Sequence, residues 1–268
     1  MDAQSLLAAL LLGAVEGLTE FLPVSSTGHL IILSSVLGLT EEKDKAFSIV
    51  IQLGAILAVV WEYRERFARV ALGLRTDPVQ QRFVANLAVA FVPAAVLGLA
   101  FHARIKALLF NPVSVAAALI VGAILILAVE RWYRARGAPR IATVDDMTWK
   151  DALKVGLAQC FSLIPGTSRS AATIMGGMVF GLSREAATQF SFFLAVPIMV
   201  AATGHQVVKY RDLFTPSDWA ALAAGFVAAF LAALLAVRTV IRYVARHDYR
   251  PFAWYRIGLG LVVLAYFS

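Results

Sequence analysis

Apolar residues fall into long runs along this chain, and short polar connections separate the runs. A helix needs about 20 consecutive apolar residues to cross the hydrocarbon core of a bilayer, and several runs approach that length. We predict six membrane-spanning helices, at about 46–61, 83–101, 112–129, 188–208, 218–237 and 254–267. The pattern therefore indicates an all-α polytopic membrane protein.

Two further apolar stretches, at about 3–39 and 152–182, are rich in Gly, Ser and Thr, and one proline interrupts each of them. The connections around them require each stretch to enter and leave the membrane on the same side. Broken backbone at membrane depth is tolerated only where it is buried in protein or lines a water-filled cavity. We therefore predict two re-entrant helical hairpins.

Composition and charge agree with a membrane protein, since 60% of the residues are hydrophobic and 15% are charged. The net charge is +7, and the basic residues gather in three connections. These residues are Arg64, Arg66, Arg69, Arg75 and Arg82; Arg131, Arg134, Arg136, Arg140 and Lys150; and Arg238, Arg242, Arg246 and Arg250. The positive-inside rule places all three connections in the cytoplasm, which puts both chain ends outside. Such bunched charge disfavours a nucleic-acid-binding surface.

The two halves of the chain resemble each other weakly. Phe21-Leu22-Pro23 before Ser25-Ser26 matches Leu163-Ile164-Pro165 before Thr167-Ser168, and Phe47-Ser48 matches Phe190-Ser191, at offsets of 142 and 143 residues. Each half, about 1–135 and 150–268, then holds one re-entrant hairpin followed by three spans. Because three is an odd number of crossings, we predict a single membrane domain, 1–268, built as an inverted-topology repeat. Chance similarity among apolar segments is the alternative.

A first polar cluster begins with Glu16 and Glu20, which lie four residues apart in an apolar helix-like run, so both carboxylates emerge on one face. An acidic residue at the centre of a spanning helix costs about 2.5–3.5 kcal/mol on insertion scales, so the pair calls for a cation or a proton. Hydroxyls and an imidazole follow, from Ser25, Ser26, Thr27 and His29. This set suits phosphoryl chemistry, in which carboxylates hold a divalent metal or act as a base. A polar helix seam with both glutamates protonated is the alternative.

A second polar cluster interrupts the other re-entrant stretch, and it comprises Pro165, Gly166, Thr167, Ser168, Arg169 and Ser170. Thr167 or Ser168 can cap the helix that follows. With the guanidinium of Arg169 and the nearby hydroxyls, this helix N-terminus is a candidate cradle for a phosphate or diphosphate. Alternatively, Arg169 is only a counter-ion to Glu16 or Glu20. Because inverted repeats bring broken helices together near the midplane, we expect both clusters to face one cavity.

The strings EGLTEFLPVSSTGH (16–29) and PGTSRS (165–170) resemble the two signature regions of the bacterial undecaprenyl-diphosphate phosphatase family, also called the bacitracin-resistance family. The stretches 51–60 and 190–197 are also similar to this family. The resemblance implies hydrolysis of undecaprenyl diphosphate, which recycles the lipid carrier of peptidoglycan synthesis and confers bacitracin resistance. It further implies a divalent cation, Mg²⁺ or Ca²⁺, and a multi-pass protein of the bacterial inner membrane whose active site opens to the periplasmic side. Ala171 departs from the family, which commonly has Gly there.

The two clusters and the resemblance together give the candidate site residues. The candidate catalytic residues are Glu16, Glu20, Ser26, His29 and Arg169, of which Glu16 and Glu20 would hold the metal. The candidate residues for binding the diphosphate are Ser25, Thr27, Thr167, Ser168, Arg169 and Ser170. The sequence does not decide whether Ser26, His29 or metal-bound water attacks the terminal phosphorus.

Two other classes of function fit parts of this pattern. Secondary transporters and lipid flippases also combine inverted repeats, broken helices and acids at the midplane. A structural membrane protein with a polar seam would need neither a metal nor the polar residues. The expected partners are a polyprenyl diphosphate and membrane lipids, with no nucleic acid, and the oligomeric state, a homo-oligomer included, is left open.

Overall fold

The computed structural model describes residues 3–39, 42–109, 111–210 and 213–267, and in these ranges the chain is helical and forms no β-strand. The α-helices are α1 (Ala3–Glu20), α2 (Ser26–Val36), α3 (Glu42–Glu62), α4 (Arg64–Gly73), α5 (Pro78–Leu109), α6 (Pro112–Ala135), α7 (Trp149–Gln159), α8 (Arg169–Val179), α9 (Arg184–Tyr210), α10 (Trp219–Val244) and α11 (Arg250–Phe267). Short 3-10 helices are η1 (Val144–Asp146), η2 (Cys160–Leu163) and η4 (Pro216–Asp218). The predicted all-α fold is confirmed.

Five helices of the described chain, α3, α5, α6, α9 and α10, are long and apolar enough to cross a membrane. Each of them contains one of the predicted spans. The sixth predicted span, 254–267, lies in α11, which is not among the five. Arg250 and Arg256 lower the hydropathy of α11, so its crossing stays a prediction.

Both predicted re-entrant stretches form helical hairpins, α1 with α2, and α7 with η2 and α8. Pro23 and the pair Pro165-Gly166 fall in the turns, where the first helix of each hairpin stops. In each turn a serine has a positive φ, 69° at Ser25 and 74° at Ser168. Such a conformation costs a non-glycine residue about 1–3 kcal/mol, so contacts around the turns must hold it.

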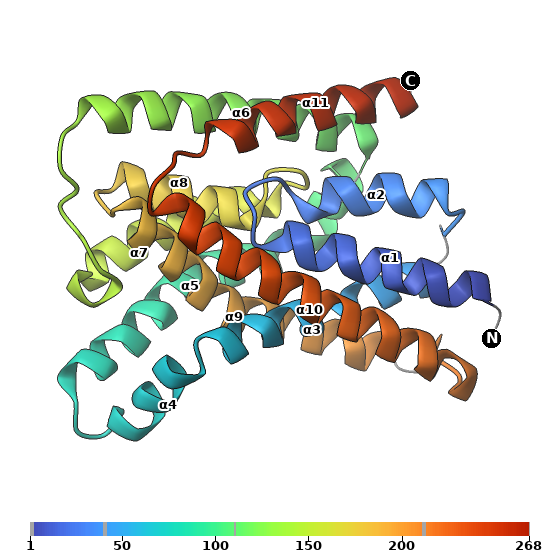
Figure 1. Ribbon diagram of the computed structural model, residues 1–268, viewed down its shortest axis with the longest axis horizontal. Coiled ribbons are helices and arrows are strands. Elements are labelled where there is room, and N and C mark those ends of the chain that lie inside the picture. Colours follow the sequence, from blue (N-terminus) through green and yellow to red (C-terminus); the bar gives the residue numbers. More distant parts are fainter. Residues whose placement is uncertain (1–2, 40–41, 110, 211–212, 268) are drawn as a thin grey trace.

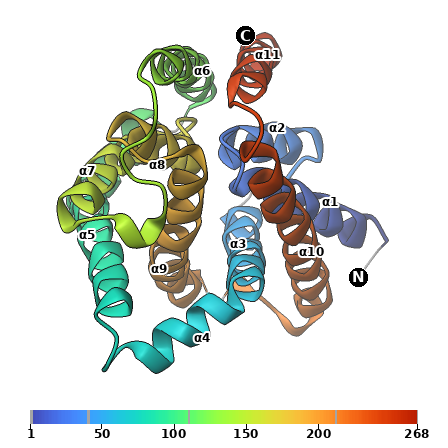
Figure 2. The same cartoon turned by 60° about the vertical axis from the view of Figure 1, so that its left-hand side comes forward.

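The helices are arranged in three layers, as Figures 1 and 2 show. In one layer α5, α9, α3 and α10 lie side by side, each packed against the next. The two hairpins cover this layer, because α1 packs on α10 and α3, α7 on α5, and α8 on α9. The pair of α6 and α11 forms the third layer, next to α2 and α8. The turns of both hairpins are therefore enclosed between helices.

The two halves of the chain exchange equivalent contacts. A Cβ on Gly13 of α1 would lie 2.2 Å from the carbonyl oxygen of Gly225 in α10, and a Cβ on Gly156 of α7 would lie 2.5 Å from that of Ala90 in α5. Each hairpin thus packs its first helix, through a glycine, against a long helix of the other half. An internal repeat would produce this pairing, and the opposite orientation of the halves in the membrane stays a prediction.

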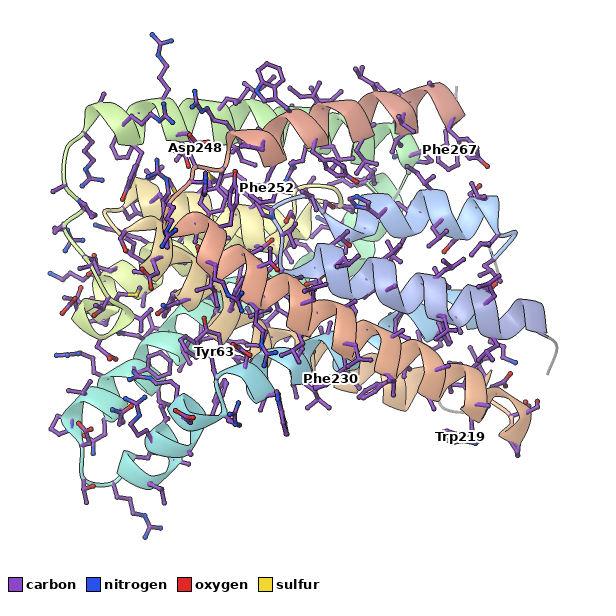
Figure 3. All side chains as sticks on the ribbon, viewed as in Figure 1. Tyr63, Trp219, Phe230, Asp248, Phe252 and Phe267 are labelled. Atoms are coloured by element: carbon purple, nitrogen blue, oxygen red, sulfur yellow. The ribbon has the colours of Figure 1, made fainter. Side chains whose placement is uncertain are left out.

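The basic connections gather at one end of the molecule. In Figure 1, α4 and the segments that join α6 to α7 and α10 to α11 lie at the left, whereas α1 begins and α11 ends at the right. Figure 3 places Asp248 and Trp219 toward these opposite ends. Ion pairs of Asp248 with Arg134 and Arg250 hold the basic end together. The three arginine-rich connections therefore share one side, as the positive-inside rule requires.

Candidate active site

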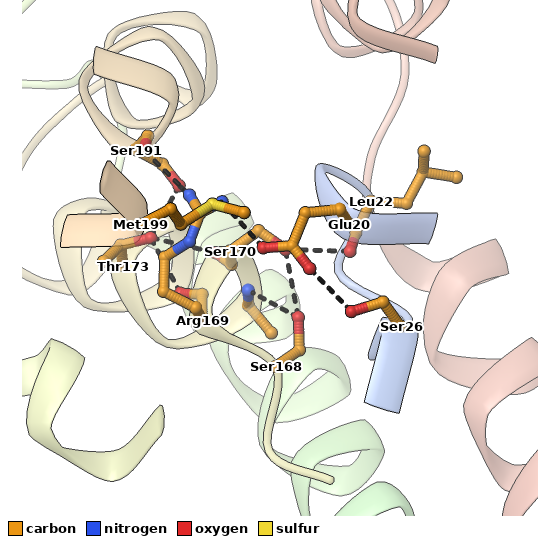
Figure 4. A network of polar contacts seen from close by, with 10 residues as sticks. Glu20, Leu22, Ser26, Ser168, Arg169, Ser170, Thr173, Ser191 and Met199 are labelled. Carbon is orange, nitrogen blue, oxygen red and sulfur yellow. Dashed lines mark hydrogen bonds and ion pairs between the residues drawn. The ribbon is translucent and has the colours of Figure 1, made fainter. Parts of the chain in front are cut away.

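Three side chains from the two hairpins meet where the turns face each other (Figure 4). Glu20 is the last residue of α1, Ser26 is the first of α2, and Arg169 is the first of α8. Ser26 Oγ donates a hydrogen bond to Glu20 Oε2 at 2.6 Å, and Arg169 Nη2 lies 3.2 Å from Glu20 Oε1. The side chains of Arg169 and Glu20 are only 11% and 10% exposed. The structure thus joins the two sequence clusters through a shielded ion pair.

Helix α9 fixes the guanidinium of Arg169 from its other side. Arg169 Nη1 donates to the carbonyl oxygen of Ser191 at 2.9 Å and lies 3.3 Å from its hydroxyl. Thr173, one helical turn after Arg169, places its Oγ1 2.6 Å from Ser191 Oγ, and both residues are fully buried. The planar fork of donors is therefore held in one orientation.

Glu16 lies one helical turn before Glu20 and is completely buried. Neither of its carboxylate oxygens has a hydrogen-bond partner among the described residues. The carboxyl group interacts electrostatically with Glu20 and Arg169, and it lies beside the amide of Gln52. Burying an ionised carboxylate without partners costs several kcal/mol, so this position calls for a cation or a proton.

The serines of the second turn stabilise local structure. Ser168 caps α8 by accepting a hydrogen bond from the N–H of Ala171 at 3.2 Å, as one of the two predicted caps would. Ser170 Oγ is 3.0 Å from Ser168 Oγ and donates to the carbonyl of Leu22 at 2.8 Å, which ties the two turns together. Both hydroxyls therefore lie at the junction of the two turns.

His29 contacts Tyr255 of α11. Its Nδ1 lies 2.8 Å from the carbonyl of Ser25, and its Nε2 lies 2.6 Å from the hydroxyl of Tyr255. Because a carbonyl only accepts, Nδ1 carries the proton of the neutral ring and Nε2 accepts from Tyr255. The two rings also stack, with centroids 5.5 Å apart. His29 is thus near the turn, but its two nitrogens are engaged by Ser25 and Tyr255.

The remaining predicted residues lie in the turns themselves. Ser25 is 3% exposed, whereas Thr27 in α2 and Thr167 in the second turn are partly exposed. The carbonyl of Thr167 accepts a hydrogen bond from Arg256 at 2.9 Å. All the predicted residues therefore lie in the two turns or within about one helical turn of them, and His29 is engaged by α11.

Several residues at the site were not singled out from the sequence. Thr173 follows Arg169 by four positions, so helical spacing could have placed it on the same face. Arg256 lies inside the predicted span 254–267, and a charge within a span is itself a signal of function. Ser191 was noted in the internal repeat and in the family resemblance, but no role was assigned to it. Tyr255 gave no signal, because its partner His29 lies 226 positions away.

The acids at this site fit a divalent cation only together with a ligand. The described residues contain no group of three or more His, Cys, Asp or Glu side chains that could hold a metal. Mg²⁺ commonly binds one or two carboxylates together with substrate phosphates. Glu16, with two free oxygens in the described chain, and Glu20 offer such a partial site.

Comparison with known proteins points to one family. The family model described as Bacitracin resistance protein BacA matches residues 9–262. The chain is similar to the undecaprenyl-diphosphatase of Cupriavidus necator, at 56% identity over 98% of this chain and 96% of that protein. It is also similar to the undecaprenyl-diphosphatase of Aromatoleum aromaticum and to undecaprenyl-diphosphatase 2 of Rhodospirillum rubrum, each at 59% identity over 99% of this chain and 96% of the relative.

Proposed function

Because the chain belongs to the bacitracin resistance protein BacA family, we propose that it hydrolyses undecaprenyl diphosphate to undecaprenyl phosphate and inorganic phosphate. This reaction would return the lipid carrier to cell-wall synthesis. The observation that carries the proposal is the junction of the two hairpins, where the shielded pair of Glu20 and Arg169 lies beside the buried Glu16. An acid pair and a guanidinium from opposite halves can bind a metal and a diphosphate at one point.

Arg169 would bind the terminal phosphoryl group. A guanidinium can donate two parallel hydrogen bonds to phosphate oxygens, and Ser191 already holds this one in place. When the diphosphate binds, it would take over part of the interaction that Arg169 now makes with Glu20. Further hydrogen bonds would come from the candidate residues of the turns, Ser25, Thr27, Thr167, Ser168 and Ser170.

Ser26 is the nucleophile that the geometry supports best. Its hydroxyl donates to Glu20 at 2.6 Å, so Glu20 can accept the proton while Ser26 Oγ attacks the terminal phosphorus. The bond from this phosphorus to the bridging oxygen breaks, undecaprenyl phosphate leaves, and water then hydrolyses the phosphoserine. Attack by water with Glu20 as the base is the alternative. His29 could transfer a proton only after the hydrogen bond between its Nε2 and the hydroxyl of Tyr255 breaks.

Glu16 and Glu20 would hold Mg²⁺ or Ca²⁺. The buried, partnerless oxygens of Glu16 support this assignment. A bound divalent cation neutralises charge on the diphosphate and so favours phosphoryl transfer. The role of this chain is to supply the two carboxylates and to keep Arg169 and Ser26 beside them.

The protein would lie in the bacterial inner membrane as an inverted repeat whose active site opens to the periplasmic side. The common end of the arginine-rich connections supports a cytoplasmic location for that end. The two hairpins, which meet between the helix layers, would then be re-entrant from opposite sides.

Phosphate release by the purified protein in detergent tests this function. We expect release from undecaprenyl diphosphate to stop with a chelator and to return with Mg²⁺ or Ca²⁺. Glu20→Gln and Arg169→Ala should each lower the rate by at least about 100-fold, because each removes a group that acts on developing charge.

Arg238→Ala is the matched control, since Arg238 pairs with Glu62 and its side chain is 41% exposed; its rate should stay close to wild type. Rates near wild type in Glu20→Gln or Arg169→Ala would overturn the assigned roles. A transporter or flippase would release no phosphate in detergent, where no membrane separates two compartments.

A further inference from the structure

Arg256 of α11 is a completely buried cation whose partners are all backbone carbonyls. Its Nε donates to Leu119 at 3.2 Å, its Nη1 to Pro23 at 3.2 Å and Thr167 at 2.9 Å, and its Nη2 to Ala118 and Gly166, both at 3.1 Å. A guanidinium has five N–H donors, so every donor has its own acceptor. Burial of such a charge costs several kcal/mol, and no ion pair found among the described residues includes Arg256. Packing alone does not explain why a guanidinium is buried at this cost in free energy.

The five carbonyls belong to three separate parts of the molecule. Pro23 lies in the turn of the first hairpin, Gly166 and Thr167 lie in the turn of the second, and Ala118 and Leu119 belong to α6. One side chain therefore connects both turns to each other and to a rigid helix. Glu20 and Ser26 flank the first turn, and Arg169 follows the second.

Arg256 also lies next to the two strained residues of the backbone. Thr167, whose carbonyl accepts from Arg256, directly precedes Ser168, and Pro23 lies two residues before Ser25. Ser25 and Ser168 are the non-glycine residues with positive φ in the described chain. Strained conformations persist only where the surroundings over-determine them, and hydrogen bonds from a fixed guanidinium do so here. In a trans peptide the N–H points away from the carbonyl, so Arg256 also directs the N–H groups of Val24 and Ser168 to the side opposite itself.

Helix α6 leaves room for this guanidinium because residue 122 is a glycine. A Cβ on Gly122 would lie 2.2 Å from Arg256 Nη2 and 2.9 Å from its Cζ. Gly122 follows Ala118 by one helical turn, so any side chain there would block the approach to the Ala118 carbonyl. The position thus depends on a residue without a side chain.

We propose that Arg256 is a positioning residue of the hydrolase: it holds both hairpin turns in the strained geometry that brings Glu20, Ser26 and Arg169 together. The inference rests on the proposed function. It assigns Arg256 no contact with the substrate, so its effect falls on the rate of the chemical step. Lysine cannot replace it, because an ammonium has three donors around one atom and cannot reach five carbonyls.

Two variants test the proposal in the full-length protein, with undecaprenyl diphosphate in detergent as the substrate. Arg256→Lys keeps the charge but loses the fork of donors. Gly122→Ala keeps Arg256 but pushes its guanidinium aside, while alanine favours the helix. We expect kcat per folded enzyme to fall by about 100-fold in each variant, as small misplacements of reacting groups can cause, with KM changing much less. The folded fraction is measured by size exclusion and thermal unfolding.

Gly258→Ala is the matched control, because Gly258 lies two residues from Arg256 in α11 and a Cβ there meets nothing within 4 Å. It should keep the wild-type kcat. If Arg256→Lys does not fold, the kcat of Gly122→Ala alone tests the positioning role. A wild-type kcat in folded Gly122→Ala or Arg256→Lys would overturn the positioning role. This includes the case in which the substitution lowers the folded fraction but leaves the kcat of the folded enzyme unchanged. If the wild type and Gly258→Ala themselves released no phosphate, the proposed function would fail first.

Discussion

At the residue scale, two buried glutamates differ in the hydrogen-bond donors that surround their carboxylates. Glu16 and Glu130 are both completely buried. Glu130 accepts from Arg184 Nε at 3.0 Å and Nη2 at 2.5 Å, and from the N–H of Tyr249 at 3.0 Å. The oxygens of Glu16 have no such donors in the described chain. Glu130 thus belongs to a structural ion pair, whereas the Glu16 carboxyl group is the one that we propose binds a metal.

Substitution of these two glutamates by glutamine should change stability in opposite directions. Glu16→Gln removes the cost of burying an ionised carboxylate and its repulsion by Glu20, so we expect it to raise the free energy of unfolding, in the presence of a chelator, by about 1–3 kcal/mol while phosphate release is lost. Glu130→Gln weakens a buried ion pair and should lower the free energy of unfolding by up to about 3–5 kcal/mol. The folded fraction of this variant should keep its activity. Unfolding in detergent at neutral pH measures both. Destabilisation by Glu16→Gln would show that its carboxylate has a structural partner.

Part of the site could be predicted from residue types alone. Glu16, Glu20 and Arg169 are charges in apolar runs, and such charges are expensive enough to imply a function. The partners of Arg256 could not be predicted, because a backbone carbonyl carries no sequence signal. The stacking of His29 on Tyr255 could not be predicted either, since the two residues are 226 positions apart.

At the element scale, glycine contacts determine how closely the hairpins approach the long helices. Gly13 of α1 lies against the backbone of Gly225 in α10, and Gly156 of α7 lies against that of Ala90 in α5. Small residues allow such close approach in membranes, where packing takes the place of the hydrophobic effect between helices. These contacts position the turns and hence the site.

Alanine at Gly13 should therefore destabilise the protein. Its Cβ would lie 2.2 Å from a carbonyl oxygen that belongs to backbone and cannot rotate away. We expect the free energy of unfolding to fall by about 1–3 kcal/mol, as overpacking typically causes. Gly204→Ala in α9, where a Cβ meets nothing within 4 Å, should change it by less than about 1 kcal/mol. Equal effects of the two substitutions in chemical unfolding would argue against the tight α1–α10 contact.

Apolar length predicted the long helices well, because a membrane span is defined by apolar length. It did not predict α4, Arg64–Gly73, which lies in an arginine-rich connection and has no buried residue. It also does not decide whether α11 crosses the membrane, since Arg256 lies within an otherwise apolar run. Length and hydropathy cannot show which buried charges find hydrogen-bond partners in the folded protein.

At the scale of the whole molecule, the charged connections and the chain ends lie at opposite ends. The arginine-rich connections lie at one end, and the start of α1 and the end of α11 lie at the other. Ion pairs such as that of Arg66 with Asp145 link these connections to one another. An asymmetric charge of this kind orients a protein in the membrane.

Cysteine labelling of intact cells tests this orientation. In a Cys160→Ser background, Ser217→Cys near the start of α10 should react with a membrane-impermeant maleimide. Ala138→Cys, between α6 and α7, should react only after the cells are permeabilised. Both positions are exposed in the structure. Labelling of Ala138→Cys in intact cells, with Ser217→Cys protected, would reverse the proposed topology.

The place of Arg256 in chain order has a consequence for biogenesis. During translation Glu16, Glu20, Ser26 and Arg169 all enter the bilayer before α11 is synthesised. Until that helix docks beside α6, the two turns lack the hydrogen bonds of Arg256, so under the proposed positioning role a nascent chain on the ribosome would carry every group of the site and still be inert. Activity would begin only when α11 docks, so the enzyme would itself report whether this helix has been inserted.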